Sequence, residues 1–107
     1  MNIPYPYSKV DSVICPEYNF GAMENVGCIT YTEQILFKSE PTRKQETWMQ
    51  NVIMHELAHQ WFGNLITMHW WDDLWLNEAF ATFIACLCQN SYKNVGDEAW
   101  LDLIKNQ

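Results

Sequence analysis

The run His55-Glu56-Leu57-Ala58-His59 decides how the rest of this chain is interpreted. In a helix, two histidines four residues apart lie on the same face, one turn above the other. Their ring nitrogens can then share one metal ion, at the roughly 2.0–2.1 Å that zinc prefers. Glu56 lies about 100° further round the helix, where it can approach the open side of the metal without ligating it. The motif therefore predicts a zinc site with Glu56 as general base for a metal-activated water.

A catalytic zinc needs a third protein ligand, and Glu78 follows His59 by nineteen residues. That gap is long enough for a loop and a returning helix. Two histidines and one glutamate, with the fourth position left to water, form a catalytic rather than a structural arrangement. We therefore expect one Zn²⁺ per chain, bound by His55, His59 and Glu78. The alternative is a pair of surface histidines on an ordinary amphipathic helix, with Glu78 simply solvated.

Short strands come before helices in this sequence. Residues 10–15 form a β-prone run that Pro16 ends, and a loop around two glycines follows over residues 17–27. A second strand is expected from Ile29, running on into residues 35–37. Because strands precede helices, the predicted fold class is α+β.

The pattern becomes helical from about Thr42 to Phe62, and a second helix should end near Gln89. The connection between them, residues 65–71, is apolar enough to be buried, and a third helix should start at Asp97. The first helix is expected to carry one face with Trp48, Val52, His55, His59 and Phe62. The second is expected to carry an apolar stripe of Leu76, Phe80, Phe83 and Leu87.

Composition excludes some functions. Apolar residues make up 49% of the chain, which indicates a folded protein, and most aromatic side chains are expected in its core. Thirteen acids against six bases give a formal net charge of −7. No basic patch is available to neutralise phosphates, so nucleic acid is excluded as a partner.

Four cysteines, Cys15, Cys28, Cys86 and Cys88, include no CxxC pair. We interpret them as buried thiols rather than as a disulfide framework, which favours a reducing compartment. A cytoplasmic chain is thus slightly favoured over a membrane-anchored ectodomain, although the sequence does not decide between them.

A second motif, Gly21-Ala22-Met23-Glu24-Asn25, taken alone indicates a glycine-led turn with a solvated acid. It is followed by HELAHQWFGNLIT at residues 55–67 and by WWDDLWLNEAFAT at residues 70–82. Together these stretches resemble the zinc aminopeptidase family that includes aminopeptidase N, puromycin-sensitive aminopeptidase and leukotriene hydrolase. The resemblance covers roughly residues 4 to 83.

The resemblance implies a role for each matching residue. His55, His59 and Glu78 match the family's zinc ligands, and Glu56 matches its general base. The family removes N-terminal residues from peptides, so the expected partner is a peptide substrate with a free N-terminus.

The resemblance also implies how the peptide is held. Residues Gly21, Ala22, Met23, Glu24 and Asn25 match the substrate-binding segment, whose backbone pairs with the peptide like an edge strand. Within it, Glu24 matches the carboxylate that binds the α-ammonium group. Asn77 and Thr82, which flank Glu78, are candidates for orienting that ligand.

The family's fold implies that residues 1–107 are part of a thermolysin-like zinc peptidase catalytic domain. Residues 1–40 would form its strand and loop part and residues 41–107 the helical part with the zinc site. We expect the chain to be a fragment that lacks the remaining domains. The family's oxyanion-stabilising tyrosine would lie beyond Gln107, and Tyr92 comes too early to replace it.

Competing functions remain open at this point. The first is a zinc-dependent aminopeptidase; the alternative is a catalytically incomplete fragment that binds zinc or a peptide without turnover. Epoxide hydrolysis, as in the leukotriene hydrolase branch, is disfavoured because the motif is GAMEN rather than GGMEN. Ala79 and Val26 depart from the family's usual residues without touching a ligand. Residue preference and oligomeric state cannot be predicted from this sequence.

Overall fold

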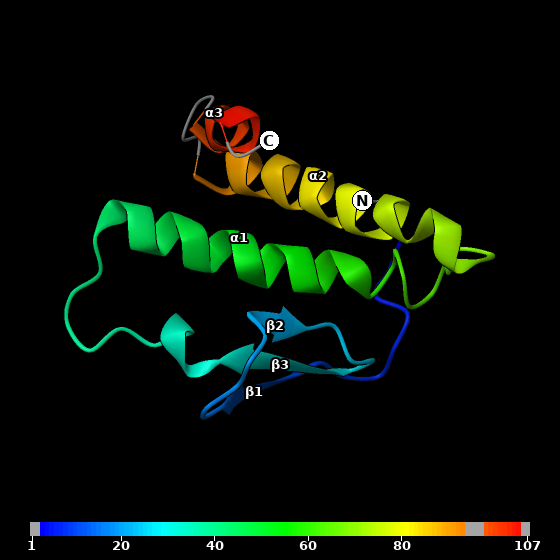
Figure 1. Ribbon diagram of the computed structural model, residues 1–107, viewed down its shortest axis with the longest axis horizontal. Helices are drawn as coiled ribbons and strands as arrows, with labels where there is room; N and C mark the ends of the chain where they lie inside the picture. The colour runs from blue at the N-terminus through cyan, green and yellow to red at the C-terminus, as the bar shows by residue number, and fades with distance from the viewer. Residues whose placement is uncertain (1–2, 94–97, 106–107) are drawn as a thin grey trace.

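The sheet and the helices follow one another along the chain (Figure 1). This computed structural model describes residues 3–93 and 98–105. The strands are β1 (Asp11–Cys15), β2 (Ala22–Met23) and β3 (Cys28–Thr32), and the helices are α1 (Arg43–His59), α2 (Leu74–Lys93) and α3 (Glu98–Lys105). The α+β class predicted from the sequence is therefore confirmed. The predicted start of the third helix at Asp97 lies outside the described residues.

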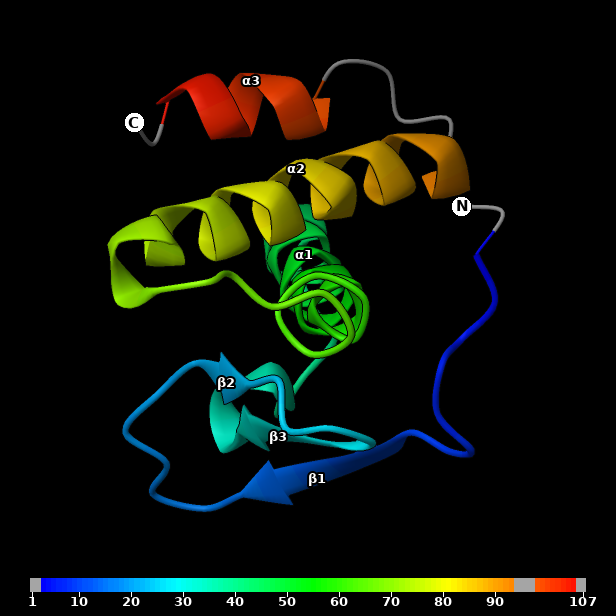
Figure 2. The ribbon, with the colours of Figure 1, turned by 90° about the vertical axis from the view of Figure 1, so that its right-hand side faces the viewer.

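The elements are stacked in layers, with α1 in the middle. Figure 2 shows α1 almost end-on, with the sheet on one side and α2 on the other, and α3 beyond α2. After α1 the chain turns back, so that α2 runs over α1 in the reverse direction (Figure 1). A helix placed between two layers must bury two of its faces. One face of α1 packs against the sheet and the other packs against α2.

The face of α1 toward the sheet is aliphatic. Ile29 of β3 is fully buried, and Tyr31 and Ile35 complete the core cluster. The α1 residues packed against this cluster are Met49, Val52, Ile53 and Leu57. Val52 therefore faces the sheet, and the prediction that it shares one face with the histidines is wrong.

The sheet has the strand order β1-β3-β2. β1 is parallel to β3, with Asp11 opposite Cys28, whereas β2 is antiparallel, with Ala22 opposite Tyr31. β2 is thus an edge strand, and it contacts α1. Residues 17–27, expected to be loop throughout, contain this short strand.

β3 does not continue into residues 35–37, and that prediction is wrong. The strand ends at Thr32, whose hydroxyl accepts a hydrogen bond from the Gln34 backbone N–H at 3.4 Å and caps a 3₁₀ turn, Glu33–Ile35. The turn brings Ile35 into the core, at 6% exposed, and leaves Leu36 62% exposed.

α1 begins at a capping box and ends earlier than predicted. The Thr42 hydroxyl accepts from the Gln45 backbone N–H, while the Gln45 side chain accepts from the Thr42 backbone N–H. The helix ends at His59 rather than Phe62. The Gly63 N–H bonds to the Ile66 carbonyl and the Asn64 N–H bonds to the His59 carbonyl five residues back, so the i→i−4 pattern of the helix does not continue.

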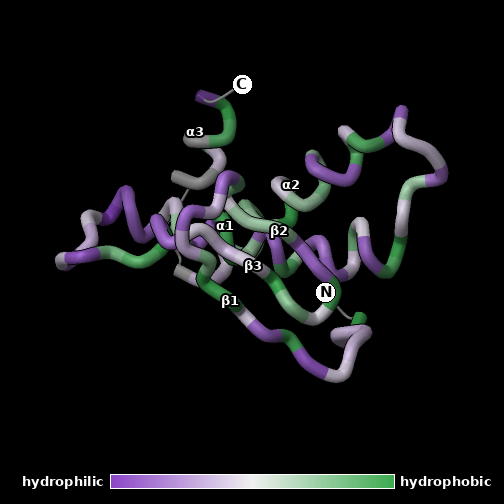
Figure 3. Tube along the Cα trace, turned by 60° about the horizontal axis from the view of Figure 1, so that its bottom comes forward, coloured by the Kyte–Doolittle hydropathy of each residue, from purple (hydrophilic) through white to green (hydrophobic). Residues whose placement is uncertain are grey.

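α2 packs on α1 through small residues, not through the predicted stripe. Ala81, Ala85, Cys86 and Gln89 are buried, whereas Leu76, Phe80, Phe83 and Leu87 are 36–48% exposed. Residues 79–88 of α2 are apolar apart from Thr82, so periodicity alone permits either face to be buried. Figure 3 shows the hydropathy of each residue along the trace. The alanine face is the buried one because small side chains let the two helices approach closely.

The connection before α2 is also exposed, contrary to prediction. Leu65 and Ile66 are 49% and 60% exposed, and Trp70, Trp71 and Trp75 are 64–71% exposed. The assignment of most aromatics to the core is wrong for these tryptophans. None of the four cysteines forms a disulfide; Cys86 is buried, but Cys88 is exposed, so the prediction of buried thiols is wrong for Cys88. Among the described residues, no helix combines the length and hydropathy needed to cross a membrane.

Candidate metal centre

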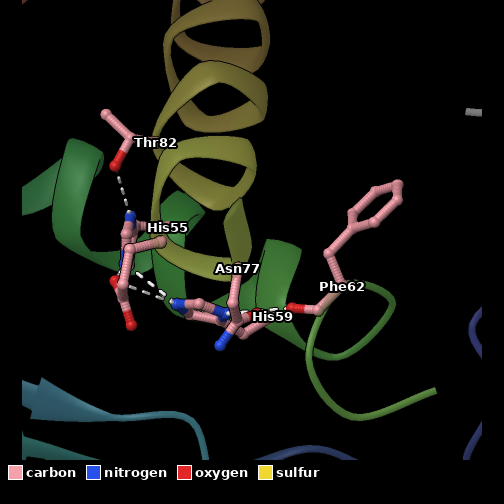
Figure 4. A network of polar contacts seen from close by, with 6 residues as sticks. His55, His59, Phe62, Asn77 and Thr82 are labelled. Atoms are coloured by element: carbon pink, nitrogen blue, oxygen red, sulfur yellow. Dashed lines mark hydrogen bonds and ion pairs between the residues drawn. The ribbon is translucent and has the colours of Figure 1, made fainter. Parts of the chain in front are cut away.

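Three side chains from two helices converge where α2 passes over α1 (Figure 4). Nε2 of His55 and Nε2 of His59 lie 3.0 Å apart. Oε2 of Glu78 lies 3.1 Å from Nε2 of His55 and 3.6 Å from Nε2 of His59. The side chains of His55 and His59 are 19% and 1% exposed, whereas that of Glu78 is 54% exposed. The cluster is therefore buried on the α1 side and open at the glutamate.

The hydrogen bonds of Nδ1 determine which ring nitrogen of His59 carries the proton. Nδ1 lies 3.0 Å from the backbone carbonyl of Phe62 and 3.2 Å from Oδ1 of Asn77. A carbonyl oxygen can only accept, so Nδ1 must donate. In the neutral imidazole, Nε2 then presents a lone pair to the cluster, as a metal ligand must.

His55 also contacts α2 through its other ring nitrogen, Nδ1. Its Nδ1 lies 3.3 Å from the hydroxyl of Thr82. Burial, followed by the neighbouring His59, lowers the pKa of His55, while Glu78 opposes that shift. The neutral ring, which is the ligand form of histidine, is thereby favoured. Asn77 and Thr82 thus contact the two histidine rings, and not Glu78 as the sequence suggested.

The donor set fits a divalent metal ion. Two imidazole nitrogens and one carboxylate oxygen lie within 4.8 Å of one another. Ligand atoms about 2.0–2.1 Å from a tetrahedral ion lie about 3.4 Å apart, close to the separations between these atoms. A bound cation would attract the Glu78 carboxylate and the Nε2 lone pair of His59, and that of His55 when its proton is on Nδ1. His55, His59 and Glu78 could therefore hold a metal ion.

Glu56 lies beside the cluster but is not among the converging ligands. It is 7% exposed, and its Oε2 has no hydrogen-bond partner among the described residues. The pKa of Glu56 is raised from an ordinary 4.5 to about 7, chiefly by burial; His59 opposes the shift, and the charges of Glu24 and Glu78 add to it. A carboxyl group with that pKa can both accept and release a proton near neutral pH.

The segment Gly21–Asn25 lies along the edge of the sheet. Ala22 and Met23 form β2, and the Gly21 carbonyl accepts from the Thr32 N–H at 2.9 Å. Glu24 follows β2 directly and is half-buried. The side chains of Gln60 and Asn64, which follow His59, donate to the Glu24 carbonyl, so Glu24 lies near the end of α1 that carries the candidate metal ligands.

A comparison of the whole sequence with known protein families identifies the family of this chain. Residues 1–107 match the peptidase family M1 domain. This chain belongs to peptidase family M1. The peptidases of this family are metallopeptidases, and the M1 chain has a histidine and glutamate group that could hold a metal ion. The resemblance drawn from the sequence motifs is therefore confirmed.

The M1 chain is similar to several characterised aminopeptidases. It is 51% identical over 85 residues to aminopeptidase N of Streptomyces lividans, covering 79% of this chain and 10% of that protein. It is 51% identical over 84 residues to leucyl aminopeptidase of Saccharolobus solfataricus, covering 78% and 11%. Identity to endoplasmic reticulum aminopeptidase 2 of Bos taurus is 50% over 91 residues, covering 83% and 10%. The chain thus spans about a tenth of the length of these relatives.

The residues that position His59 and Glu24 through hydrogen bonds were not predicted from the sequence. The Phe62 contact uses a backbone carbonyl, for which no side-chain signal exists. Gln60 and Asn64 bond to the backbone beside Glu24, more than thirty residues earlier in the chain. The one available signal was Gln60 itself, a polar residue between His59 and two aromatic residues, where an amide requires buried partners.

Gly63 supports the metal centre through Asn77. Gly63 has φ +117°, and a Cβ there would lie 2.5 Å from Oδ1 of Asn77. We predict that Gly63→Ala displaces the Asn77 side chain from His59 and weakens metal binding about 10- to 100-fold. A competition titration against a chelating dye measures this affinity on folded protein.

A double-variant comparison separates this clash from general strain at the positive φ. Asn77→Ala removes the atom that the new Cβ meets, so Gly63→Ala should weaken metal binding little further in that background. Equal losses in the two backgrounds would contradict the proposed contact.

The raised pKa of Glu56 predicts a pH-dependent stability of the metal-free protein. Below about pH 4.5 the carboxyl is protonated in both folded and unfolded chains. As pH rises from about 4.5 to about 7, the unfolded chain ionises this carboxyl while the folded chain keeps it protonated, so the free energy of unfolding falls and then levels off above about pH 7. Since one pKa unit corresponds to about 1.4 kcal/mol, the shift of about 2.5 units limits the loss by pH 8 to about 3.5 kcal/mol.

Glu56→Gln resembles the protonated carboxyl at every pH. Chemical denaturation should therefore find it more stable than the unsubstituted chain at pH 8 and about equally stable at pH 4. The exposed Glu40→Gln is the control and should show no such difference. A gain for Glu56→Gln that is the same at both pH values would contradict the assignment.

Proposed function

We propose that this chain carries the zinc site and the N-terminus anchor of an aminopeptidase, which hydrolyses the first peptide bond of a peptide with a free amino group. One observation carries the proposal. The candidate metal ligands, the buried Glu56 and the segment with Glu24 lie together at one end of α1. Membership of family M1 and the aminopeptidase names of the similar proteins support the same reaction.

The zinc ion would be held by His55, His59 and Glu78. When bound, it supplies Lewis-acid chemistry, activating water and polarising the scissile carbonyl. Glu56 accepts the proton of the attacking water and passes it to the nitrogen of the leaving amine as the C–N bond breaks. Its pKa of about 7 suits both transfers.

The Glu24 carboxylate would bind the α-ammonium of the substrate. Because β2 is an edge strand, its free side can pair with an extended peptide backbone. A carboxylate at the end of this strand would bind a charged amino terminus. It would disfavour a peptide with further residues on the N-terminal side of that position. This accounts for cleavage of one residue at a time.

A second candidate is a zinc- or peptide-binding chain without turnover. Glu78 is 54% exposed, and the start of α2 around it is exposed at Leu74, Trp75 and Leu76. Electrostatic stabilisation of a transition state is strongest where water is excluded, and an open site weakens it.

Zinc content and turnover on one preparation separate the two candidates. We expect one zinc per folded chain by elemental analysis and hydrolysis of an aminoacyl chromogenic amide. Glu56→Gln should keep the zinc and lose turnover by about 10²- to 10⁴-fold, since it removes the proton acceptor alone.

The N-acetylated amide is the matched control substrate, because it lacks the ammonium group that Glu24 would bind. It should not be hydrolysed. Bound zinc without turnover would support the second candidate, and unchanged activity of Glu56→Gln would overturn the assignment of the base.

A further inference from the structure

The end of α1 is bonded to the turn that follows Glu24, through a side chain with no assigned role. Gln60 follows His59 directly and is fully buried. Its Nε2 donates to the Glu24 carbonyl at 3.1 Å, and its Oε1 accepts from the Gly27 N–H at 3.1 Å. One amide group therefore both donates and accepts, which few other side chains of this size can do.

Asn64 makes a second connection between the same two places. Its Nδ2 donates to the Glu24 carbonyl at 2.7 Å, so that carbonyl receives two side-chain hydrogen bonds. The backbone N–H of Asn64 donates to the carbonyl of His59 at 3.0 Å. The Glu24 carbonyl is thus connected to the residues around His59 in two ways. Gln60, the next residue after His59, bonds to it directly, and Asn64 bonds both to it and to the His59 carbonyl.

The turn between these contacts is itself restrained. The Cys28 N–H bonds to the Asn25 carbonyl at 3.0 Å, and Gly27 has φ +67°, a conformation that favours glycine. The Gly27 carbonyl accepts from the Asp11 N–H at 2.9 Å. Any shift of this turn relative to α1 would leave the buried Gln60 amide unpaired on both sides, which is energetically costly.

We propose that Gln60 and Asn64 are positioning residues that hold Glu24 at a fixed place relative to His59, and so set where a substrate amino group is bound relative to the metal ligands. This inference rests on the proposed function. Its physical basis is that binding and reaction both depend on the placement of groups to within a fraction of an ångström. The Gln60 and Asn64 side chains bond the Glu24 backbone and are not required to touch the substrate.

Gln60→Met tests the hydrogen bonds, because methionine has a similar volume but neither donates nor accepts strongly. Gln89→Met is the matched control. Gln89 is also buried, at 4% exposed, and its Nε2 donates to the Thr47 carbonyl at 2.8 Å, between α2 and α1. Thermal unfolding, zinc content and zinc affinity should be measured for both variants.

Two readouts apply to the zinc-loaded chain. The first is amide hydrogen exchange at Gly27, which Gln60→Met should accelerate at least tenfold and Gln89→Met should leave unchanged. The second is calorimetric binding of an aminoacyl amide and of its N-acetylated analogue. Gln60→Met should weaken binding of the free-amine ligand about 10- to 100-fold, with zinc affinity and binding of the acetylated ligand unchanged. Where turnover is measurable, KM should rise more than kcat falls.

Asn64→Asp is a second variant for the case in which Gln60→Met does not fold. It keeps the size of the side chain but replaces the donor with a carboxylate facing the Glu24 carbonyl, and it should weaken the same ligand. Unchanged affinity for the free-amine ligand in a folded variant, or an equal loss in Gln89→Met, would overturn the proposal.

The binding readout separates this proposal from the proposed function. If the unsubstituted chain binds the free amine selectively but does not hydrolyse the amide, the catalytic assignment fails and the positioning role is still supported by the variants. If the unsubstituted chain does not distinguish the amine from its acetylated form, no amine anchor exists and the positioning proposal fails as well.

Discussion

The candidate site depends on one electrostatic constraint, the convergence of two imidazole nitrogens and a carboxylate oxygen where α2 passes over α1. The Phe62 carbonyl fixes the proton of His59 on Nδ1, so Nε2 of His59 is an acceptor, and burial favours the neutral form of His55. With the His55 proton on Nδ1, facing the Thr82 hydroxyl, all three converging atoms can bind one cation. The metal ion would therefore join α1 to α2 as well as supply chemistry.

Packing on either side of α1 makes this convergence possible. Aliphatic residues hold the helix to the sheet, and the alanines Ala58, Ala81 and Ala85 are buried within the two helices that pack together. Because small residues let α2 approach closely, Asn77, Glu78 and Thr82 reach the histidines. The turn after His59 brings Gln60 and Asn64 to the Glu24 backbone. The helix end thus orients the metal ligands on one side and the edge strand on the other.

The sequence predicted what depends on local spacing. The separation of His55 and His59 is a property of one helix, and Glu78 required only that a second helix return. The sequence predicted the wrong face of α2, because Leu76, Phe80 and the alanines repeat with similar periods. The contact of Gln60 with Glu24 joins residues 36 positions apart and depends on tertiary packing. The strand predicted over residues 35–37 is replaced by a 3₁₀ turn, which the Thr32 hydroxyl caps.

The central claim is that His55, His59 and Glu78 bind one metal ion together. X-ray absorption at the zinc edge of the zinc-loaded chain tests it most directly. We expect a shell of nitrogen and oxygen atoms at about 2.0–2.1 Å, with the outer-ring scattering of two imidazoles, and loss of one imidazole in His55→Ala. Sulfur at about 2.3 Å would place the metal on cysteines instead and contradict the account.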